Sequence, residues 1–363
     1  MKQRKIRLIF IVVLILLSLA FLVQLSKGAY EMSWKTIFNS IFSKELLLDT
    51  TYLKTQLFGE RICSILKIDK PNLNSISNEA LIIWNIRIPR FLIGICVGIN
   101  LALAGCIFQT ITKNEMSSAY TLGISQGSGL SMLIILIAFP SLYDWIPVLS
   151  MIGGIIAFLL IFTLSWDKGT SPIKLVLSGV IVGSISIAVQ KGLYYFIQDI
   201  GMFQDVLSWT TGSLIGLSWH QFRMIFPWTI LTSSLCLFLH RPLDLMLLGD
   251  DNAKSLGVSV EKWRFVFAFI GILAASSAVS IAGLIGFVGL IAPHIGRSLI
   301  GYSHKNLFIV SMMVGASLLA MSDTIARIIL RGGGQIPVGI ILNTIGGVFF
   351  MVLMKKQKKF SKL

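Results

Sequence analysis

The chain has 363 residues, of which 55% are hydrophobic and 13% are charged, whereas soluble domains carry about 25% charged residues. This composition excludes an ordinary soluble protein and predicts an all-α membrane protein that crosses the bilayer many times. The net charge of +15 does not indicate nucleic acid, because the basic residues cluster beside apolar segments as the positive-inside rule requires. The four cysteines show no metal-ligand spacing, so we expect neither a disulfide nor a metal site.

The first half of the chain is expected to hold six spans. Residues 1–25 start with basic residues and continue as an apolar run long enough to cross a bilayer, which predicts the first transmembrane helix. Residues 26–80 are polar with charges of both signs, and alternation of sides makes them an extracytoplasmic insertion. Residues 81–239 are expected to form helices two to six, the third from about residue 118, with a segment near 206–217 that is too short to span.

The second half begins with the polar segment 240–264, whose basic residues place it in the cytoplasm. Within it, the run from Asp250 to Asn252 is expected to cap a short helix that ends near Gly257. Residues 265–354 are expected to form helices seven to ten, and residues 355–363 a basic cytoplasmic tail. About ten spans with both termini in the cytoplasm satisfy the charge rule at nearly every loop.

The apolar stretch Ile281–Arg297 is unusual for a lipid-facing helix, because it carries glycines at three-residue spacing followed by proline and polar groups. Small residues let helix backbones approach closely in lipid, and the proline indicates a short or broken helix buried in protein. We expect a short eighth span here. Two interpretations stay open: a tightly packed structural helix, and a helix beside a transport pathway.

The sequence contains no G-x-x-x-x-G-K-[ST], H-E-x-x-H or G-x-S-x-G motif, so we do not expect an enzyme. Two ionisable residues within predicted spans, Lys191 and Asp323, are candidates for a polar pathway. Asp323 and Arg327 are four residues apart on one helix face, so an ion pair between them competes with a proton relay. Lys191 lines a pathway or snorkels toward the headgroups. A proton- or ion-coupled secondary transporter is the alternative class.

Three arginines fall at the outer ends of predicted helices, Arg87 and Arg90 in R-I-P-R and Arg327 in the ninth span. The guanidinium group is a rigid fork that suits carboxylates. These residues are therefore candidates for docking an acidic partner, with interfacial snorkelling as the alternative.

Several longer motifs occur in a fixed order along the chain. They are R-I-P-R at 87–90, A-L-A-G-C-I-F-Q ending at Gln109, L-G-I-S-Q-G-S-G at 122–129, W-T-T-G-S-L at 209–214, A-K-S-L-G-V at 253–258, G-F-V-G-L-I-A-P-H-I-G-R at 286–297, S-D-T-I-A-R at 322–327 and I-P-V-G-I at 336–340. From about residue 81 to residue 354 the chain thereby resembles the FecCD permeases of type II ABC importers, which take up ferric siderophores, haem and cobalamin.

This resemblance implies a permease in the cytoplasmic membrane of a bacterium that translocates an iron(III)–siderophore complex, with haem and cobalamin as alternatives. The implied partners are a second permease subunit (homo- or heterodimer), two cytoplasmic ATPases that use ATP–Mg, and an extracytoplasmic substrate-binding protein. No cofactor is expected on this chain itself. The departures N-E-M-S at 114–117, where the family usually reads N-P-L-A, and Val348, where it usually has proline, suggest one member of a heterodimer.

The resemblance also implies roles for particular residues. The binding protein's glutamates are expected to dock on Arg87, Arg90 and Arg327. Coupling to the ATPase is expected from Gly249, Asp250, Ala253, Lys254, Leu256, Gly257 and Val258. Residues expected along the pathway or in its packing are Gln109, Lys191, Gly283, Gly286, Gly289, Pro293, His294 and Asp323.

Overall fold

A computed structural model describes residues 2–28, 30–42, 50–59, 63, 77–166, 171–197, 199–330 and 334–360. In these residues six helices are long and apolar enough to cross a membrane. A seventh span arises if α12 (Trp219–Phe238) and α13 (His240–Met246), bent by 54° at their junction, are counted together. Three shorter apolar helices, α8, α16 and α18, bring the set to the ten elements expected from the sequence. The prediction of an all-α polytopic protein is confirmed.

The long helices are α1 (Lys2–Ser26), α7 (Ile88–Ile111), α9 (Ile146–Ser165), α10 (Pro172–Leu193), α15 (Val260–Ala282) and α17 (His304–Ile328). The other apolar helices are α8 (Ile124–Ala138), α16 (Val288–Ile300) and α18 (Val338–Phe360), whose apolar part is Val338–Leu353. The remaining helices are α2 (Trp34–Ile41), α4 (Thr50–Phe58), α6 (Asn78–Ile82) with the π turn η2 (Ile83–Arg87), the 3-10 turns η3 (Pro140–Trp145) and η4 (Tyr194–Phe196), α11 (Ile200–Thr211) and α14 (Asp250–Ser255).

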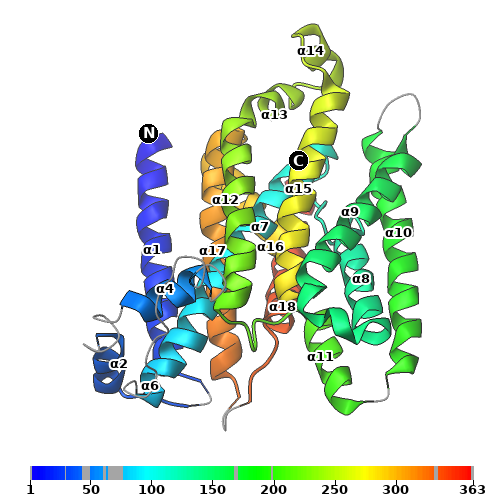
Figure 1. Cartoon of the computed structure of the whole chain (residues 1–363). Helices are drawn as coiled ribbons and strands as arrows, with labels where there is room; N and C mark the ends of the chain where they lie inside the picture. Colours follow the sequence, from blue (N-terminus) through cyan, green and yellow to red (C-terminus); the bar gives the residue numbers. More distant parts are fainter. Residues whose placement is uncertain are drawn as a thin grey trace.

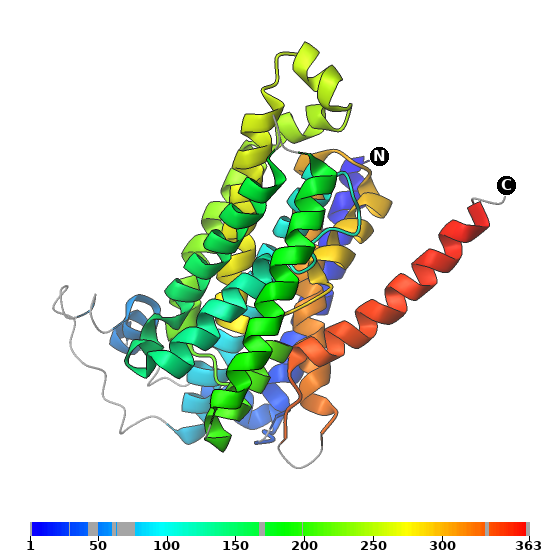
Figure 2. The same ribbon diagram turned by 90° about the vertical axis from the view of Figure 1, so that its right-hand side faces the viewer.

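Helices α13 and α14 project beyond one end of the bundle, which we call the knob end (Figure 1). Both chain termini point toward this end (Figures 1 and 2), as expected for an even number of crossings. Helices α2, α6 and α11 lie at the opposite end. With 12 residues, α11 is about 18 Å long, too short to cross the bilayer's apolar core of about 30 Å, as predicted for this region.

Helix α7 forms the centre of the bundle and packs against α12, α15, α16 and α17. Glycines make the closest of these approaches possible. A Cβ atom on Gly105 would lie 1.8 Å from the carbonyl oxygen of Gly289 in α16, and one on Gly98 would lie 2.4 Å from that of Gly315 in α17. Small residues thus let the backbones touch, which is the main source of helix association in lipid.

Two predicted helix boundaries are wrong. Helix α8 starts at Ile124 rather than near residue 118, because Ser118 and Thr121 exchange local hydrogen bonds of 2.8 and 3.2 Å between backbone N–H groups and side-chain hydroxyls. The stretch Ile281–Arg297 is not one short helix, because α15 runs on to Ala282 and α16 begins only at Val288. A broken helix, the other form considered for this stretch, is what the structure shows.

The break at residues 283–287 is held by other irregular segments. Gly283 has φ of +72°, and a Cβ atom there would lie 2.0 Å from the carbonyl oxygen of Trp209. Leu284 N–H donates to Trp209 O at 3.0 Å, and Ser213 N–H donates to Ala282 O at 2.8 Å. In a bilayer each freed backbone group needs such a partner, so these segments stabilise one another.

Of the predicted insertion, residues 29, 43–49, 60–62 and 64–76 lie outside the described residues, as do 361–363 of the basic tail. The described part of the insertion contacts the bundle. The Tyr52 hydroxyl donates to Asn85 Oδ1 at 2.7 Å, and Arg223 donates to the Gln56 carbonyl at 2.5 Å. This part of the insertion therefore packs as part of the fold.

Candidate functional site

An ion cluster lies at the opposite end, where α7 and α17 meet. Arg90 donates to both carboxylate oxygens of Asp323, at 2.5 Å from Nη2 and 3.2 Å from Nε. Arg327 Nε lies 3.3 Å from Asp323 Oδ2. The expected pair of Asp323 with Arg327 is confirmed, and Arg90, which the sequence placed only at a helix end, is its third member.

Arg87 adds a third guanidinium group, which donates to the carbonyls of Leu25 and Tyr30 rather than to a carboxylate. Three cations with one carboxylate, Asp323, leave a surplus of two positive charges (3 − 1 = 2). Arg327 Nη2 has no hydrogen-bond partner among the described residues. Buried charge without full compensation is costly, so this cluster suits an anionic partner.

All three arginines are buried, since Arg87, Arg90 and Arg327 are only 4%, 3% and 6% exposed. The reason lies in segments distant in sequence. The end of α1 and the residues after it cover Arg87, and Gln335 Oε1 accepts a 2.5 Å hydrogen bond from Arg90.

The knob carries a second charged cluster, centred on Asp250. Its carboxylate contacts Lys113 Nζ at 3.0 Å and Arg264 Nη2 at 2.8 Å, and Arg264 is 1% exposed. Burial works to raise the pKa of Asp250, but hydrogen bonds from Arg264 and Lys113 outweigh it and hold the pKa below the usual range. The short helix was predicted correctly, but its N-cap is Gly249, with φ of +100°, and not one of the acidic residues.

The surface of the knob is unusually apolar for a projecting segment. Leu247, Leu248 and Leu256 are 46%, 56% and 60% exposed, whereas Ala253 is fully buried beneath them. Gly257 follows the C-cap of α14 with φ of +82°, and no atom of the described residues lies within 4 Å of where its Cβ would be. Of the other predicted coupling residues, Lys254 is exposed and Val258 is half-buried.

The loop after α7 joins the knob to α16. Lys113 reaches Asp250, while two residues later Glu115 Oε1 lies 3.4 Å from Arg297 Nε and Glu115 Oε2 lies 3.8 Å from His294 Nδ1. Gln109 completes the contact, since it accepts a hydrogen bond from Arg297 and donates to Gly289 O at 3.1 Å. Gln109, Lys113, Glu115 and Arg297 border a cavity of about 300 Å³. Glu115 stands in the N-E-M-S departure, so the sequence marked the position but not the contact.

A further pair at the knob end was missed altogether. The Asp244 carboxylate accepts from the His304 backbone N–H at 2.7 Å and lies 2.8 Å from His304 Nδ1, and His304 Nε2 lies 2.9 Å from the Thr110 hydroxyl. Burial works to raise the pKa of Asp244, but the bonds from His304 prevail and lower it. Residues 60 positions apart give no local pattern that would reveal such a pair.

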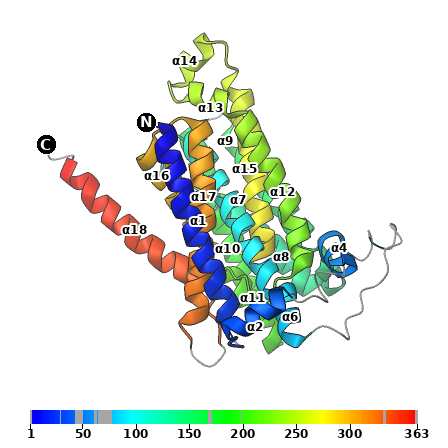
Figure 3. The same ribbon diagram turned by 90° about the vertical axis from the view of Figure 1, so that its left-hand side faces the viewer.

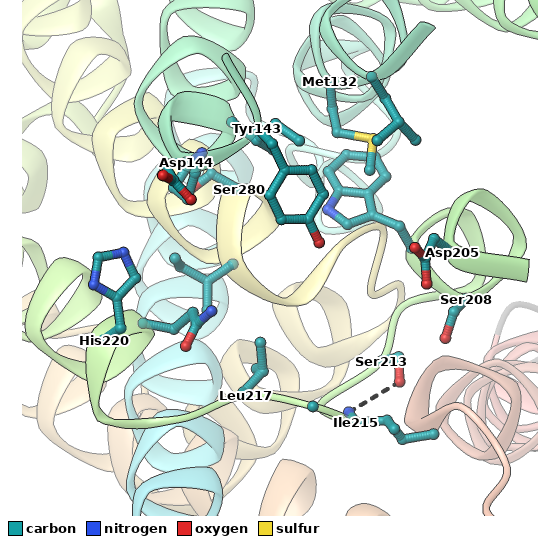
Figure 4. Close-up of a pocket in the computed structure, with 17 residues that line it drawn as sticks. Met132, Tyr143, Asp144, Asp205, Ser208, Ser213, Ile215, Leu217, His220 and Ser280 are labelled. Carbon is teal, nitrogen blue, oxygen red and sulfur yellow. Dashed lines mark hydrogen bonds between the residues drawn. The ribbon is translucent and has the colours of Figure 1, made fainter. Parts of the chain in front are cut away.

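A recess of about 310 Å³ opens at the opposite end between α8, α11 and α12. Figure 4 shows Tyr143 near its centre, Asp144 and His220 on one side, and Asp205 with Ser208 on the other. No group of three His, Cys, Asp or Glu side chains in the described residues is placed to hold a metal ion. Lys191 is exposed on α10 and lines none of these cavities, whereas Gly286 and Pro293 are buried.

Comparison with known proteins defines the class. The fold matches a solved structure described as an inward-facing transporter assigned to the metal-chelate ABC type, with a TM-score of 0.75 and 26% identity over 97% of this chain and 99% of that one. The chain is thus an integral membrane protein with the fold of an ABC importer permease.

The family follows from sequence comparison. The model of the FecCD transport family matches residues 15–356. The chain is 35% identical to the Fe(3+)-citrate import system permease protein YfmE of Bacillus subtilis, over 77% of this chain and 83% of that protein. It is 32% identical to the vitamin B12 import system permease protein BtuC of Vibrio cholerae, over 77% and 85%. The chain belongs to the FecCD transport family, as its motifs indicated.

Proposed function

We propose that this chain is the permease subunit of an ATP-driven importer that moves an iron(III)–siderophore complex across the cytoplasmic membrane. The observation that carries the proposal is the family match over residues 15–356. The similarity to a ferric citrate permease and to a metal-chelate transporter favours a chelated iron substrate. The similarity to a vitamin B12 permease makes cobalamin the second candidate.

The knob is the proposed contact with the ATPase subunits, which would supply ATP–Mg chemistry that this chain lacks. Leu247, Leu248 and Leu256 give the knob an exposed apolar tip at the end of a short helix. Helices commonly bind partner proteins by placing such side chains in an apolar groove. The ion pairs of Asp250 fix the knob to α7 and α15, so a push on the tip reaches the bundle.

The arginine cluster is the proposed docking site for acidic residues of an extracytoplasmic binding protein. Its two surplus positive charges support this role. Because Arg87 donates to the carbonyls of Leu25 and Tyr30, docking would exchange neutral acceptors for carboxylates. Charge-assisted hydrogen bonds are roughly twice as strong as neutral ones.

A second permease subunit is the proposed partner of α10 and α18. Helix α18 stands away from the rest of the bundle (Figure 2) and exposes Val348, Met351 and Val352. Helix α10 exposes Leu177, Ile181 and Ile185 on its own outer side. In this arrangement the pathway would lie between two subunits.

The direct test is uptake of radioactive iron, supplied as several ferric siderophores and as ferric citrate, in cells with and without this chain. Loss of uptake for one ferric complex would support the proposal and name the substrate. If only labelled cobalamin depended on the chain, the second candidate would replace it. Uptake that collapsed with an uncoupler at high cellular ATP would instead favour an ion-coupled carrier, the class that family membership argues against.

Coupling is tested separately with the knob. Leu256→Asp places a charge on the exposed tip without disturbing a buried contact, so the fold should be retained while uptake falls and ATP hydrolysis no longer follows substrate. Tyr302→Asp is the matched control, because Tyr302 is also 60% exposed at the knob end but lies outside α13 and α14. Equal uptake in both variants would remove the knob from the mechanism.

A further inference from the structure

Helix α1 is more deeply buried near the opposite end than toward the knob end. Near the opposite end Ala20, Gln24 and Leu25 are 1%, 1% and 2% exposed, and Gln24 donates to Ala320 O at 3.1 Å and to Thr324 Oγ1 at 3.0 Å. Toward the knob end Leu8 and Ile11 are 65% and 54% exposed. Figure 3 shows α1 running beside α17 and α16 on the surface of the bundle.

A groove of about 510 Å³ lies between the knob-end half of α1 and its neighbours. It is lined by Leu8, Ile9, Val12, Val13 and Leu16 of α1, Leu299 of α16, and Val314, Ser317, Leu318 and Met321 of α17. The hydroxyl of Ser317, the sole polar side chain in this set, is already bonded to Met313 O at 2.6 Å. Such a surface offers an occupant dispersion contacts and no hydrogen bonds.

Exposed basic residues precede the groove on α1. Arg4, Lys5 and Arg7 are exposed within one turn of Leu8, where the groove begins. None of the ion pairs found in the described part of the chain involves these three residues. The positive-inside rule accounts for basic residues at the start of a transmembrane helix. It does not account for an apolar groove that begins directly beside them.

We propose that this groove binds an anionic glycerophospholipid, with hydrocarbon chains between α1 and α17 and the phosphate headgroup at Arg4, Lys5 and Arg7. The lining and the nearby charge favour an anionic lipid. The groove is lined almost entirely by aliphatic side chains, which suit hydrocarbon chains. The exposed Arg4, Lys5 and Arg7 precede it on the same helix, and such cations attract anionic headgroups.

The charge of the headgroup sets the expected selectivity. Each basic residue near an anionic lipid surface strengthens binding about five-fold, so three give about 100-fold. We therefore expect the purified full chain to retain phosphatidylglycerol in preference to phosphatidylcholine of the same acyl composition. Native mass spectrometry of the protein, titrated with each lipid in detergent, measures this ratio.

Two kinds of variant separate the headgroup from the groove. The triple variant Arg4→Gln/Lys5→Gln/Arg7→Gln should lower phosphatidylglycerol affinity about 100-fold and leave phosphatidylcholine binding unchanged. Val12→Trp fills the groove and should reduce retention of both lipids. Leu14→Trp is its matched control, since Leu14 is on the same helix and 54% exposed but does not line the groove.

Equal retention of the two lipids by the unmodified chain would overturn the proposal, as would unchanged phosphatidylglycerol affinity in the triple variant. If Val12→Trp altered the oligomeric state and not lipid retention, the groove would be a contact between protein copies and the proposal would be wrong. These experiments measure lipid binding and not transport. A negative result would therefore contradict the lipid proposal and leave the proposed transport function untouched.

Discussion

Replacing Asp323 by Asn should destabilise the protein more than any other single change of charge in the bundle. Asp323 is 1% exposed and is the only carboxylate in contact with Arg90 and Arg327 in the described part of the chain. The substitution keeps the size of the side chain and removes its charge, which leaves two buried guanidinium groups uncompensated. Breaking a buried pair in this way costs about 3–5 kcal/mol. With an unfolding entropy of about 2.1 cal/mol/K per residue, that corresponds for this chain to a fall in melting temperature of about 4–7 °C.

The assay is thermal unfolding of the detergent-solubilised protein, followed by tryptophan fluorescence. The matched control is Asp251→Asn, because the Asp251 side chain is fully exposed and lies 4.0 Å from Lys254, so its melting temperature should not shift. If Asp323→Asn unfolded at the temperature of the unmodified protein, the cluster would not be a buried ionic network, and the argument that it carries uncompensated charge would be refuted.

Three further predictions concern the break between α15 and α16, the loop after α7, and the knob. Gly283→Ala should destabilise by about 2–6 kcal/mol, because φ is +72° and a Cβ atom would clash with Trp209 O; thermal unfolding beside Gly192→Ala, where no atom lies within 4 Å, measures it. Glu115→Gln should cost less than about 1 kcal/mol, because the Glu115 side chain is 47% exposed, yet raise the ATP hydrolysed per substrate in reconstituted vesicles; an unchanged ratio would contradict the link to α16. Stability should fall as the pH drops below about 4 through the lowered pKa of Asp250, and unfolding between pH 3 and 7 should show a shallower decline in Asp250→Asn.

The sequence was sufficient for the number and type of the elements, because apolar length is set by bilayer thickness. It was insufficient where polar side chains or glycines compete with the helix. The side-chain hydroxyls of Ser118 and Thr121 accept hydrogen bonds from each other's backbone N–H groups, and α8 therefore starts later. Gly283 can interrupt the apolar run because the carbonyl of Trp209, which is distant in sequence, accepts a hydrogen bond from the N–H group of Leu284. Neither effect has a signature in hydropathy.

Ionic partners were predictable only at helical spacing. The pair of Asp323 with Arg327 follows from a separation of four residues. The contact of Asp323 with Arg90, 233 positions away, and that of Glu115 with Arg297 depend on how α7 packs against α17 and α16. The burial of the arginines has no local sequence pattern for the same reason, since the residues that cover them come from the end of α1 and from Gln335.

Both charged clusters are attached to α7, and this suggests how the two ends communicate. Arg90 lies in the first turn of α7, while Gln109 and Lys113 lie at or just beyond its end, so one helix of about 36 Å joins them. Close glycine contacts with α16 and α17 leave little room for α7 to bend or slide against these neighbours. A force on the knob is therefore expected to move α7, α16 and α17 together as a rigid body. In such a movement a small displacement at the ATPase contact is carried to the opposite end of the bundle. If this is correct, Gly98→Ala should lower the substrate moved per ATP hydrolysed in reconstituted vesicles, because its Cβ atom would lie 2.4 Å from the Gly315 carbonyl oxygen and force α7 and α17 apart. An unchanged ratio would contradict the rigid-body movement of these helices.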